Sequence, residues 1–390
     1  MKYISNVAKN YPASGIRAMF DLAVNYPGAI NLTNGEPNFD TPEHIKQAGI
    51  KAIQDGFTKY GVEPGLYELR EAIADKYSEQ FGVKHKPENI MVTVAGVEGI
   101  LLSLMTLLDP GDEVIVPDPA YTCYLGQIQM LNGKVVRVPL YEEQGFILQP
   151  EDLEKVITPK TKALIITNPS NPLGTVLTKE DAEKIADLIE KNNIIVISDE
   201  VYEKIIFDGK EHFSLAQITR IKDKVLVVNS FSKTYAMTGW RVGYVVGNEK
   251  ILANMFKLQQ TVASTLPIFT QKAAVAALIG PQGAVFEMVK SYEKRRNILF
   301  DGLSEISGVK CAKPHGSFCI FANIKEFDRT SFEFAKELLS EAGVITVGGN
   351  AFGQMGEGYL RFCFANSDAD IIEAVKRLKE YIPNIPKKNR

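Results

Sequence analysis

The sequence is poor in the residues that build metal centres and disulfide frameworks. Its 390 residues include only four histidines and four cysteines, and neither an H-E-x-x-H nor a C-x-x-C motif occurs. We therefore expect no structural or catalytic metal site. The cysteines are widely spaced, which is typical of reduced thiols packed inside a cytosolic protein. They are Cys123, Cys311, Cys319 and Cys363.

Long apolar runs and an excess of positive charge are missing as well. No run approaches the roughly 20 apolar residues that cross a bilayer, and residues 1–5 lack the apolar core of a signal peptide. The formal net charge is −3, so no overall basic field would attract nucleic acid or an acidic membrane surface. We therefore expect a cytoplasmic protein that binds neither nucleic acid nor membrane.

Apolar residues, by contrast, are ample at 45% of the chain, and its middle carries short runs rich in β-branched residues. These runs are apolar on both faces, which is typical of strands covered by helices on both sides. The sequence thus predicts a seven-stranded, mainly parallel sheet. Its strands are expected at Ile90–Ala95, Glu113–Pro117, Val135–Leu140, Lys162–Thr167, Ile194–Ser198, Val225–Asn229 and Arg241–Val246.

Helical patterns separate several of these strands. Thr178–Asp181 has the form of a helix cap, and apolar residues then recur at helical spacing as far as Ile189. A second helix is expected at Leu101–Leu108, where the turn-forming residues Asp109–Asp112 end it. Because strands and helices alternate, this part of the chain is predicted to be an α/β domain.

The pattern changes near Phe286. A charged helix there is followed by strand candidates at Ser317–Ala322 and Tyr359–Phe364 and by an amphipathic helix at Asp368–Tyr381. These elements predict a smaller α+β domain, and ligands are expected beyond the C-terminal ends of the parallel strands, where domains meet. We expect three divisions: residues 1–40 as an N-terminal arm and part of the small domain, 41–285 as the large domain, and 286–390 as the C-terminal small domain.

The strongest chemical signal surrounds Lys233. This lysine follows the strand Val225–Asn229, where its amine can face the cleft. A partly desolvated amine has a lowered pKa and can attack an aldehyde. Ser230, Ser232 and Arg241 add hydroxyl donors and a permanent cation, a combination suited to a phosphate dianion. A surface lysine in a serine-rich loop is the alternative interpretation.

A second signal is a buried strand that ends in a carboxylate. Ile194–Ser198 leads directly into Asp199, and Tyr202 follows three residues later. An aspartate fixed at this position can keep a pyridine nitrogen protonated, so that the ring acts as an electron sink. Tyr202 can donate to a phenolate oxygen on the same ring. The alternative is that Asp199 only caps the following turn.

Three weaker signals point to the same cleft. Asn171 lies between prolines after a strand and can bind the phenolate oxygen, although such clusters are common in plain turns. Another strand passes into a helix at Gly96, Val97 and Glu98, whose backbone N–H groups can face an anion. Tyr121, also just after a strand, can lie flat on a pyridine ring.

Arg361 is the last candidate, because it interrupts the apolar strand Tyr359–Phe364. A buried arginine is costly without a partner. A structural ion pair with a core carboxylate would provide one. We favour the other interpretation, in which Arg361 clamps the carboxylate of a substrate.

Together these segments resemble the class I/II, fold-type I aminotransferases that depend on pyridoxal 5'-phosphate (PLP), and within them the bacterial aspartate/aromatic branch. The resemblance extends from Ser14 to Arg361, with the motifs in the family's order. It implies transfer of an amino group between an L-amino acid (aspartate, aromatic or related) and a 2-oxo acid such as 2-oxoglutarate. Some aspartate-preferring relatives have a lysine where this chain has Val97, so the side-chain specificity stays open.

The resemblance also implies a role for each candidate residue. Lys233 would hold PLP as a Schiff base and move the substrate's proton, and Asp199 would pair with the ring nitrogen. Tyr60 matches the tyrosine that family members lend to the neighbouring subunit's phosphate, which implies a homodimer with shared sites. The other assignments are Tyr202 and Asn171 at the phenolate oxygen, Ser230, Ser232, Arg241 and the backbone of Gly96, Val97 and Glu98 at the phosphate, Tyr121 on the ring, and Gly35, Tyr121, Asn171 and Arg361 at the substrate.

Two other functions remain open at this point. A PLP-dependent β-carbon–sulfur lyase would share the lysine, the aspartate and the arginine, because a fold does not determine a reaction. A PLP-sensing transcription regulator would need a DNA-binding module ahead of the family-like segment. That segment begins by Ser14 and the charge is unfavourable, so we expect an enzyme rather than a regulator.

Overall fold

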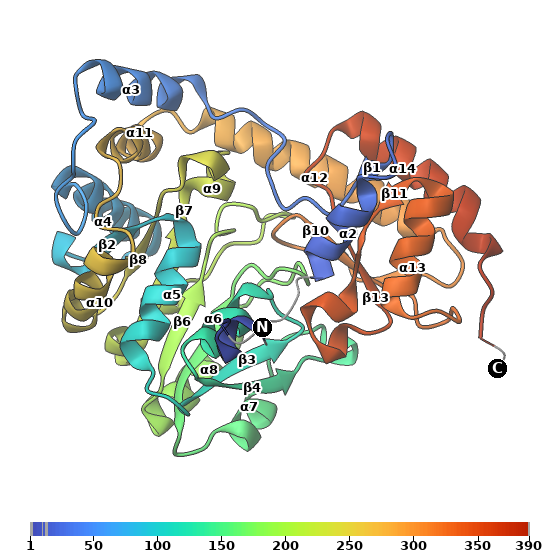
Figure 1. Cartoon of the computed structure of the whole chain (residues 1–390), viewed down its shortest axis with the longest axis horizontal. Helices are drawn as coiled ribbons and strands as arrows, with labels where there is room; N and C mark the ends of the chain where they lie inside the picture. The colour runs from blue at the N-terminus through green and yellow to red at the C-terminus, as the bar shows by residue number, and fades with distance from the viewer. Residues whose placement is uncertain (1–2, 10, 12–14, 389–390) are drawn as a thin grey trace.

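The computed structural model describes residues 3–9, 11 and 15–388. The start of the family-like segment at Ser14 lies outside the described residues, as do Met1 and Lys2. A seven-stranded sheet forms the centre of the larger part of the molecule (Figure 1). Its spatial order is β2 (Ile90–Thr93), β8 (Gly243–Val246), β7 (Val225–Ser230), β6 (Ile195–Asp199), β5 (Thr161–Thr167), β3 (Glu113–Asp118) and β4 (Lys134–Pro139).

The sheet is mainly parallel, as predicted. Strands β7, β6, β5, β3 and β4 run parallel to one another, whereas β8 is antiparallel to both β2 and β7. Strand β8 therefore lies between the first strand of the sheet and the strand that precedes Lys233. This position brings the N-terminal end of the helix after β2 close to the end of β7.

Helices cover both faces of the sheet, and the side chains of each strand alternate between them. On β5, Ala163 and Ile165 belong to one buried cluster, while Leu164 and Ile166 belong to the other. This alternation explains why the strands read as continuous apolar runs. The first cluster packs under α5 (Ala95–Leu107), α6 (Cys123–Met130) and α10 (Glu249–Val262), and the second under α4 (Tyr67–Phe81), α7 (Pro150–Val156) and α8 (Lys179–Asn192).

Three predicted strand limits are wrong, and each for the same reason. The predicted strands include Ala95, Arg241 and Ser317 at one end. In the structure these residues adopt positive φ angles of 58°, 55° and 56°, respectively. A strand cannot continue through left-handed backbone. Consequently β2 ends at Thr93, and Ala95 opens the helix α5 instead. The predicted cap at Thr178 is confirmed, since its hydroxyl accepts the N–H of Asp181 at 3.1 Å.

A smaller antiparallel sheet lies in the C-terminal part of the chain. Its order is β12 (Val347–Gly348), β13 (Tyr359–Cys363), β10 (Cys319–Asn323) and β9 (Lys310–Cys311). Helices α13 (Ser331–Glu337) and α14 (Asp368–Tyr381) belong to this part, and α12 (Gly283–Ser304) extends toward it from the large sheet (Figure 1). The N-terminal strand β1 (Ile30–Asn31) pairs in parallel with β11 (Val344–Ile345).

We propose the division into an N-terminal arm (1–40), a large domain (41–285) and a small domain (286–390). The pairing of β1 with β11 supports assigning the arm partly to the small domain. None of the helices in the described part of the chain is long and apolar enough to cross a membrane. The other α-helices are α1 (Asn6–Lys9), α2 (Gly15–Ala23), α3 (Glu43–Gln54), α9 (Phe231–Thr234) and α11 (Ile268–Ile279).

Candidate active site

A cavity of about 370 Å³ opens beyond the C-terminal ends of the parallel strands. A volume of a few hundred Å³ is typical of small-molecule sites. Most of the residues singled out from the sequence lie in its wall. They are Gly35, Gly96, Val97, Tyr121, Asn171, Asp199, Tyr202, Ser230, Ser232, Lys233, Arg241 and Arg361.

Lys233 enters this cavity from α9, the short helix that follows β7. Its ammonium nitrogen Nζ donates to the carbonyl oxygen of Gly35 at 2.5 Å. Burial lowers the pKa of Lys233, because the charged form loses its water. An amine with a lowered pKa is more often neutral and therefore more nucleophilic, so a surface lysine is not what the structure contains.

Asp199 ends β6, also lines the cavity and is buried. Burial raises the pKa of its carboxyl group to about 6, although hydrogen bonds from the hydroxyl of Tyr124 and the backbone N–H of Val201 oppose the rise. Tyr124 Oη lies 2.6 Å from Oδ2, and Val201 N lies 3.3 Å from Oδ1. One carboxylate oxygen thus caps the turn, as the alternative interpretation held, while the group as a whole faces the cavity.

Tyr124 is a site residue that the sequence did not reveal. It lies on α6, and its hydroxyl is also 2.8 Å from the hydroxyl of Thr167. Tyr124 therefore fixes the direction of the Asp199 carboxylate. A tyrosine in the first turn of a helix gives no sequence signal of this role, because its partner Asp199 is 75 residues away.

Hydroxyl groups and backbone N–H groups gather at one end of the cavity. The hydroxyl of Ser230 lies 2.8 Å from that of Ser232, and Arg241 stands beside them with Nη1 donating to the carbonyl of Thr238 at 2.8 Å. The helix α5 begins at the same place, and the N-terminus of a helix attracts anions. The arrangement suits a phosphate group.

Gly243 allows α5 to approach this place closely. A Cβ atom on Gly243 would lie 2.6 Å from the backbone carbon of Ala95 and 2.7 Å from the carbonyl oxygen of Asn229. Glu98 takes no part through its side chain, which is absent from the cavity wall. Its carboxylate accepts the N–H of Val94 at 2.5 Å and an amide N–H of Gln259 at 3.3 Å.

Arg361 is buried at the other end of the cavity and has neutral partners. Its Nη2 donates to the carbonyl of Thr33 at 2.6 Å, and Nη1 donates to the side-chain oxygen of Asn171 at 3.2 Å. Its Nε is buried without a partner. Within the described part of the chain no carboxylate pairs with Arg361, so the alternative of a core ion pair is wrong. A buried cation with spare donors can bind a carboxylate from outside.

Aromatic residues form the walls between these two ends. Tyr121 lies edge-on to Tyr124 with ring centroids 5.6 Å apart, and burial raises the pKa of Tyr121 to about 12. Tyr202 contacts Phe318 in the same manner, at 5.1 Å. Ile16 and Phe20 of α2 also line the cavity, and no sequence pattern indicates this.

Tyr60 does not line this cavity in its own chain. It belongs to the segment between α3 and α4, and 85% of its surface is exposed. Neighbouring residues of the same segment and of the segment before α11 form a second, shallow hollow around it. Any contact of Tyr60 with a phosphate would have to be made in another subunit.

Comparisons with known proteins agree with this geometry. Residues 27–378 match the family of class I and II aminotransferases. The chain is 42% identical to the aromatic-amino-acid aminotransferase 2 of Thermococcus litoralis and 43% identical to the aspartate aminotransferase of Pyrococcus abyssi, each over 95% of both chains. The solved aspartate aminotransferase of Rhizobium meliloti superposes with a TM-score of 0.95 at 33% identity, covering 98% of this chain and 99% of that one.

Family membership and the shared fold-type I architecture agree over nearly the whole length of the chain. The predicted seven-stranded α/β fold and the predicted enzyme class are thereby confirmed. The chain belongs to the class I and II aminotransferases and is an aminotransferase.

Proposed function

We propose that this aminotransferase uses PLP and exchanges an amino group between an L-amino acid and a 2-oxo acid such as 2-oxoglutarate. The observation that carries the proposal is the common cavity of Lys233, Asp199 and Arg361. It offers an amine for covalent attachment, a buried carboxylate and a buried cation within one enclosed space. These are the three groups that amino transfer on PLP needs from a protein.

The residues of the cavity fit PLP from end to end. Ser230, Ser232, Arg241 and the first turn of α5 would hold the phosphate, and Asp199 would face the ring nitrogen at the opposite edge. Burial raises the pKa of Asp199 to about 6, which disfavours its charged form, and a cationic partner would reverse that effect. When bound, PLP supplies an aldehyde and an electron-withdrawing ring that stabilises charge on the substrate's α-carbon.

Lys233 would both hold the cofactor and move the proton. Because burial lowers its pKa, the amine Nζ would be able to accept a proton from the substrate's α-carbon and deliver it to the aldehyde carbon of the cofactor, C4′. The carbonyl of Gly35, 2.5 Å from Nζ, keeps the side chain inside the cavity. Tyr202 and Asn171 would bind the phenolate oxygen of the cofactor, and Tyr121 would lie on its ring.

Arg361 would bind the carboxylate that every amino acid and 2-oxo acid carries. Its two Nη nitrogens already donate to Asn171 and Thr33, and its Nε is buried without a partner. A bidentate contact there would fix the α-carbon against Lys233, and such positioning accounts for a large part of enzymatic rate enhancement.

The wall near α2 supports a donor with an uncharged side chain. In the described part of the chain, the cationic residues lining the cavity are Lys233, Arg241 and Arg361, and each has a role above. Ile16 and Phe20 add apolar surface instead. Of the donors implied by the resemblance, an aromatic amino acid therefore fits this wall better than aspartate does.

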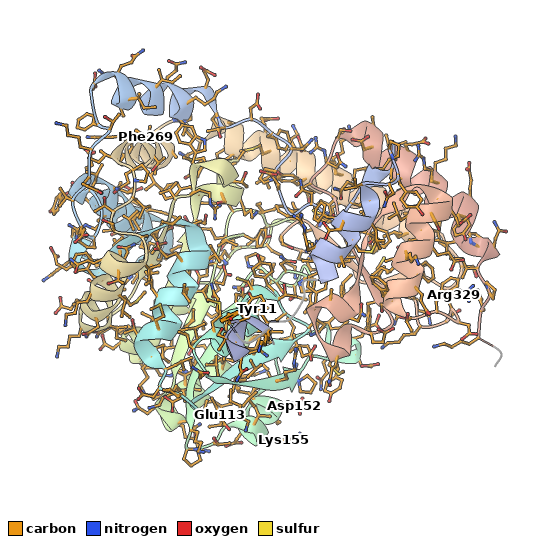
Figure 2. The ribbon with its side chains drawn as sticks, in the orientation of Figure 1. Tyr11, Glu113, Asp152, Lys155, Phe269 and Arg329 are labelled. Atoms are coloured by element: carbon orange, nitrogen blue, oxygen red, sulfur yellow. The ribbon has the colours of Figure 1, made fainter. Side chains whose placement is uncertain are left out.

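A homodimer with shared sites would bring Tyr60 to the phosphate of the neighbouring subunit. Exposed apolar residues surround it, with Val62 and Tyr67 more than half exposed. Phe269, on α11, lines the same hollow and lies at the end of the molecule opposite Arg329 of the small domain (Figure 2). Exposed apolar surface of this kind is typical of subunit contacts.

The proposal is tested by replacing Lys233 with alanine. We expect the Lys233→Ala variant to lose the visible absorbance band of the protein-bound cofactor, its reduction by borohydride, and at least about 1000-fold in amino transfer, because the covalent partner and the proton carrier are both gone. The assay mixes amino donors, aromatic and acidic, with 2-oxoglutarate and follows glutamate. Lys210→Ala, at an exposed lysine, is the matched control.

Two results would contradict the proposal. One is a Lys233→Ala variant that keeps a yellow, borohydride-reducible cofactor. The other is release of pyruvate from cystathionine without any amino transfer, which would indicate the lyase reaction on the same scaffold.

A further inference from the structure

Two cysteines face each other across neighbouring strands of the small sheet. Cys319 of β10 and Cys363 of β13 are direct partners in the antiparallel register. The backbone N–H of Phe364 donates to the carbonyl of Phe318 at 2.9 Å, whereas the N–H of Cys363 donates to Leu32 at 2.7 Å. The cysteines therefore occupy a non-hydrogen-bonded position, where the two strands come closest.

This position has the spacing that a disulfide requires. In non-hydrogen-bonded antiparallel pairs the Cα atoms are about 4.5 Å apart and the Cβ atoms about 4.5–5.5 Å apart. Disulfides join Cα atoms separated by about 4.4–6.8 Å and Cβ atoms separated by about 3.5–4.5 Å. A small inward movement of the two side chains would suffice. Both residues carry free thiols in the structure.

The two thiols are chemically unequal. The contact with the Cys363 side chain lowers the pKa of Cys319, and the charges of Arg361 and Lys233 act in the same direction against the effect of burial. Burial, followed by the hydrogen bond with Cys319, raises the pKa of Cys363. The cysteine with the lowered pKa loses its proton more readily and is the better candidate for the nucleophile in thiol–disulfide exchange.

The pair lies directly behind the wall of the active-site cavity. The thiol of Cys363 donates to the carbonyl of Asn34 at 2.9 Å, and the thiol of Cys319 lies 3.8 Å from the side-chain oxygen of Asn171. Asn34 and Asn171 both line the cavity, and Asn171 also accepts a hydrogen bond from Arg361. Both thiols are fully buried and neither lines the cavity, so a small disulfide that enters the cavity reaches them only when this part of the small sheet opens locally.

We propose that Cys319 and Cys363 are a site of reversible disulfide formation by low-molecular-weight disulfides. The Cys319 thiolate attacks one sulfur of the small disulfide, which releases one small thiolate and leaves a mixed disulfide on Cys319. The Cys363 sulfur then gives up its proton, attacks the Cys319 sulfur and displaces the second small thiolate. Two protein thiols are oxidised to one S–S bond, and one small disulfide is reduced to two thiols, which take up the two protons.

The bond would weaken the binding of the substrate's carboxylate. It would draw the sulfur of Cys363 away from Asn34 and the sulfur of Cys319 away from Asn171, and Asn171 is a partner of Arg361. This consequence rests on the proposed function, whereas the disulfide itself rests on the register and contacts of the two strands. We expect the KM for the amino donor to rise severalfold, with a smaller change in kcat, and dithiothreitol to restore it.

The test treats the folded holoenzyme with 2-hydroxyethyl disulfide, traps the remaining thiols with an alkylating agent and maps the peptides by mass spectrometry. We expect a cross-link between the peptides of Cys319 and Cys363, accompanied by a loss of about two free thiols per chain. Cys363→Ser should abolish this cross-link. Cys311→Ser, on the neighbouring strand β9, is the matched control and should form it as the natural sequence does.

The peptide map decides the matter independently of catalysis. Three results would overturn the proposal. Cys319 and Cys363 could both remain open to alkylation after the treatment, or each could carry a separate 2-hydroxyethyl adduct. The third result is a cross-link of either residue to Cys123 or Cys311. If Cys363→Ser does not fold, the map of the natural sequence still gives the answer. A cross-link that forms without any rise in the KM for the amino donor would support the disulfide and count only against the proposed binding of the substrate's carboxylate near Asn171 and Arg361.

Discussion

At the scale of single residues, the carboxylate of Asp199 depends on a partner that is remote in the sequence. Burial raises the pKa of Asp199, and the hydrogen bond from Tyr124 limits that rise to about 6. A protonated Asp199 could not hold a proton on the ring nitrogen of a cofactor. Tyr124 is therefore a positioning residue, which acts through Asp199 rather than on the substrate.

Replacing Tyr124 with phenylalanine tests this role. The variant keeps the ring against Tyr121 but loses the hydroxyl, so the pKa of Asp199 should rise further. A hydrogen bond to a charged group contributes about 1.5–3 kcal/mol, so we expect kcat to fall about tenfold or more at neutral pH. The acidic limb of the pH–rate profile should move to higher pH. Tyr141→Phe, at a partly exposed tyrosine, should leave the profile unchanged, and an unshifted limb in Tyr124→Phe would contradict the role.

The sequence predicted some site residues and missed others for physical reasons. Lys233 and Asp199 each follow an apolar strand, and a charge at that point has few structural uses. Arg361 stands out because a cation interrupts an apolar strand. Tyr124 carries no such mark, since a buried tyrosine is ordinary in any core. The direction of the Glu98 side chain, toward Val94 and away from the cavity, depends on packing that no local pattern reports.

At the scale of elements, a buried ionic network joins α4 to the turn after β6 and to the strand β8. The ammonium of Lys76 contacts the carboxylate of Glu203 and lies 2.7 Å from the hydroxyl of Tyr244. Burial by itself raises the pKa of Glu203, but the charges of Lys76 and His212 outweigh it, so the pKa lies below its usual value. The carboxylate therefore stabilises the fold above the unfolded-state pKa of about 4.3, and this contribution is lost as the pH falls through its lower folded pKa.

Replacing Lys76 with methionine should destabilise the protein strongly. Removing one partner of a buried ion pair typically costs about 3–5 kcal/mol, because the remaining charge has no compensation. Burial would then raise the pKa of Glu203. The loss of stability should therefore be largest near pH 7, and it should shrink as the pH approaches 4 and the carboxyl group becomes protonated. Urea unfolding at several pH values measures it. Lys184→Met, at an exposed pair with Glu180, is the control and should change little.

An equal loss of stability at pH 7 and at pH 4 would contradict this account of Glu203.

The elements of the large sheet were only partly predictable from the sequence. All seven strands were predictable from their apolar runs, but their spatial order was not. The antiparallel insertion of β8 between β2 and β7 rests on contacts such as that of Gly243 with Ala95, which are far apart in the chain.

At the scale of the whole molecule, the proposed role of Tyr60 would connect catalysis to assembly. Its ring is 85% exposed and lies beside a shallow hollow lined by Phe57, Pro267 and Phe269. A monomer would leave this tyrosine without a function and the surface uncovered. A homodimer would cover the surface and could place each Tyr60 at the phosphate of the other subunit, where its hydroxyl can donate a hydrogen bond.

Mixing two variants distinguishes a shared site from a self-contained one. Tyr60→Phe should weaken PLP binding about tenfold, since a hydrogen bond to an anion is lost, and Lys233→Ala should be inactive. In a mixed dimer, the subunit with Tyr60→Phe keeps its own Lys233 and receives an intact Tyr60 from its Lys233→Ala neighbour. One site of each mixed dimer is then complete. After subunit exchange at a PLP concentration that leaves Tyr60→Phe mostly empty, activity should exceed the sum of the separate variants. Tyr67→Phe, in the same exposed region, is the matched control and should bind PLP normally. Activity equal to the sum, or a monomer in sedimentation equilibrium, would show that Tyr60 serves no neighbouring site.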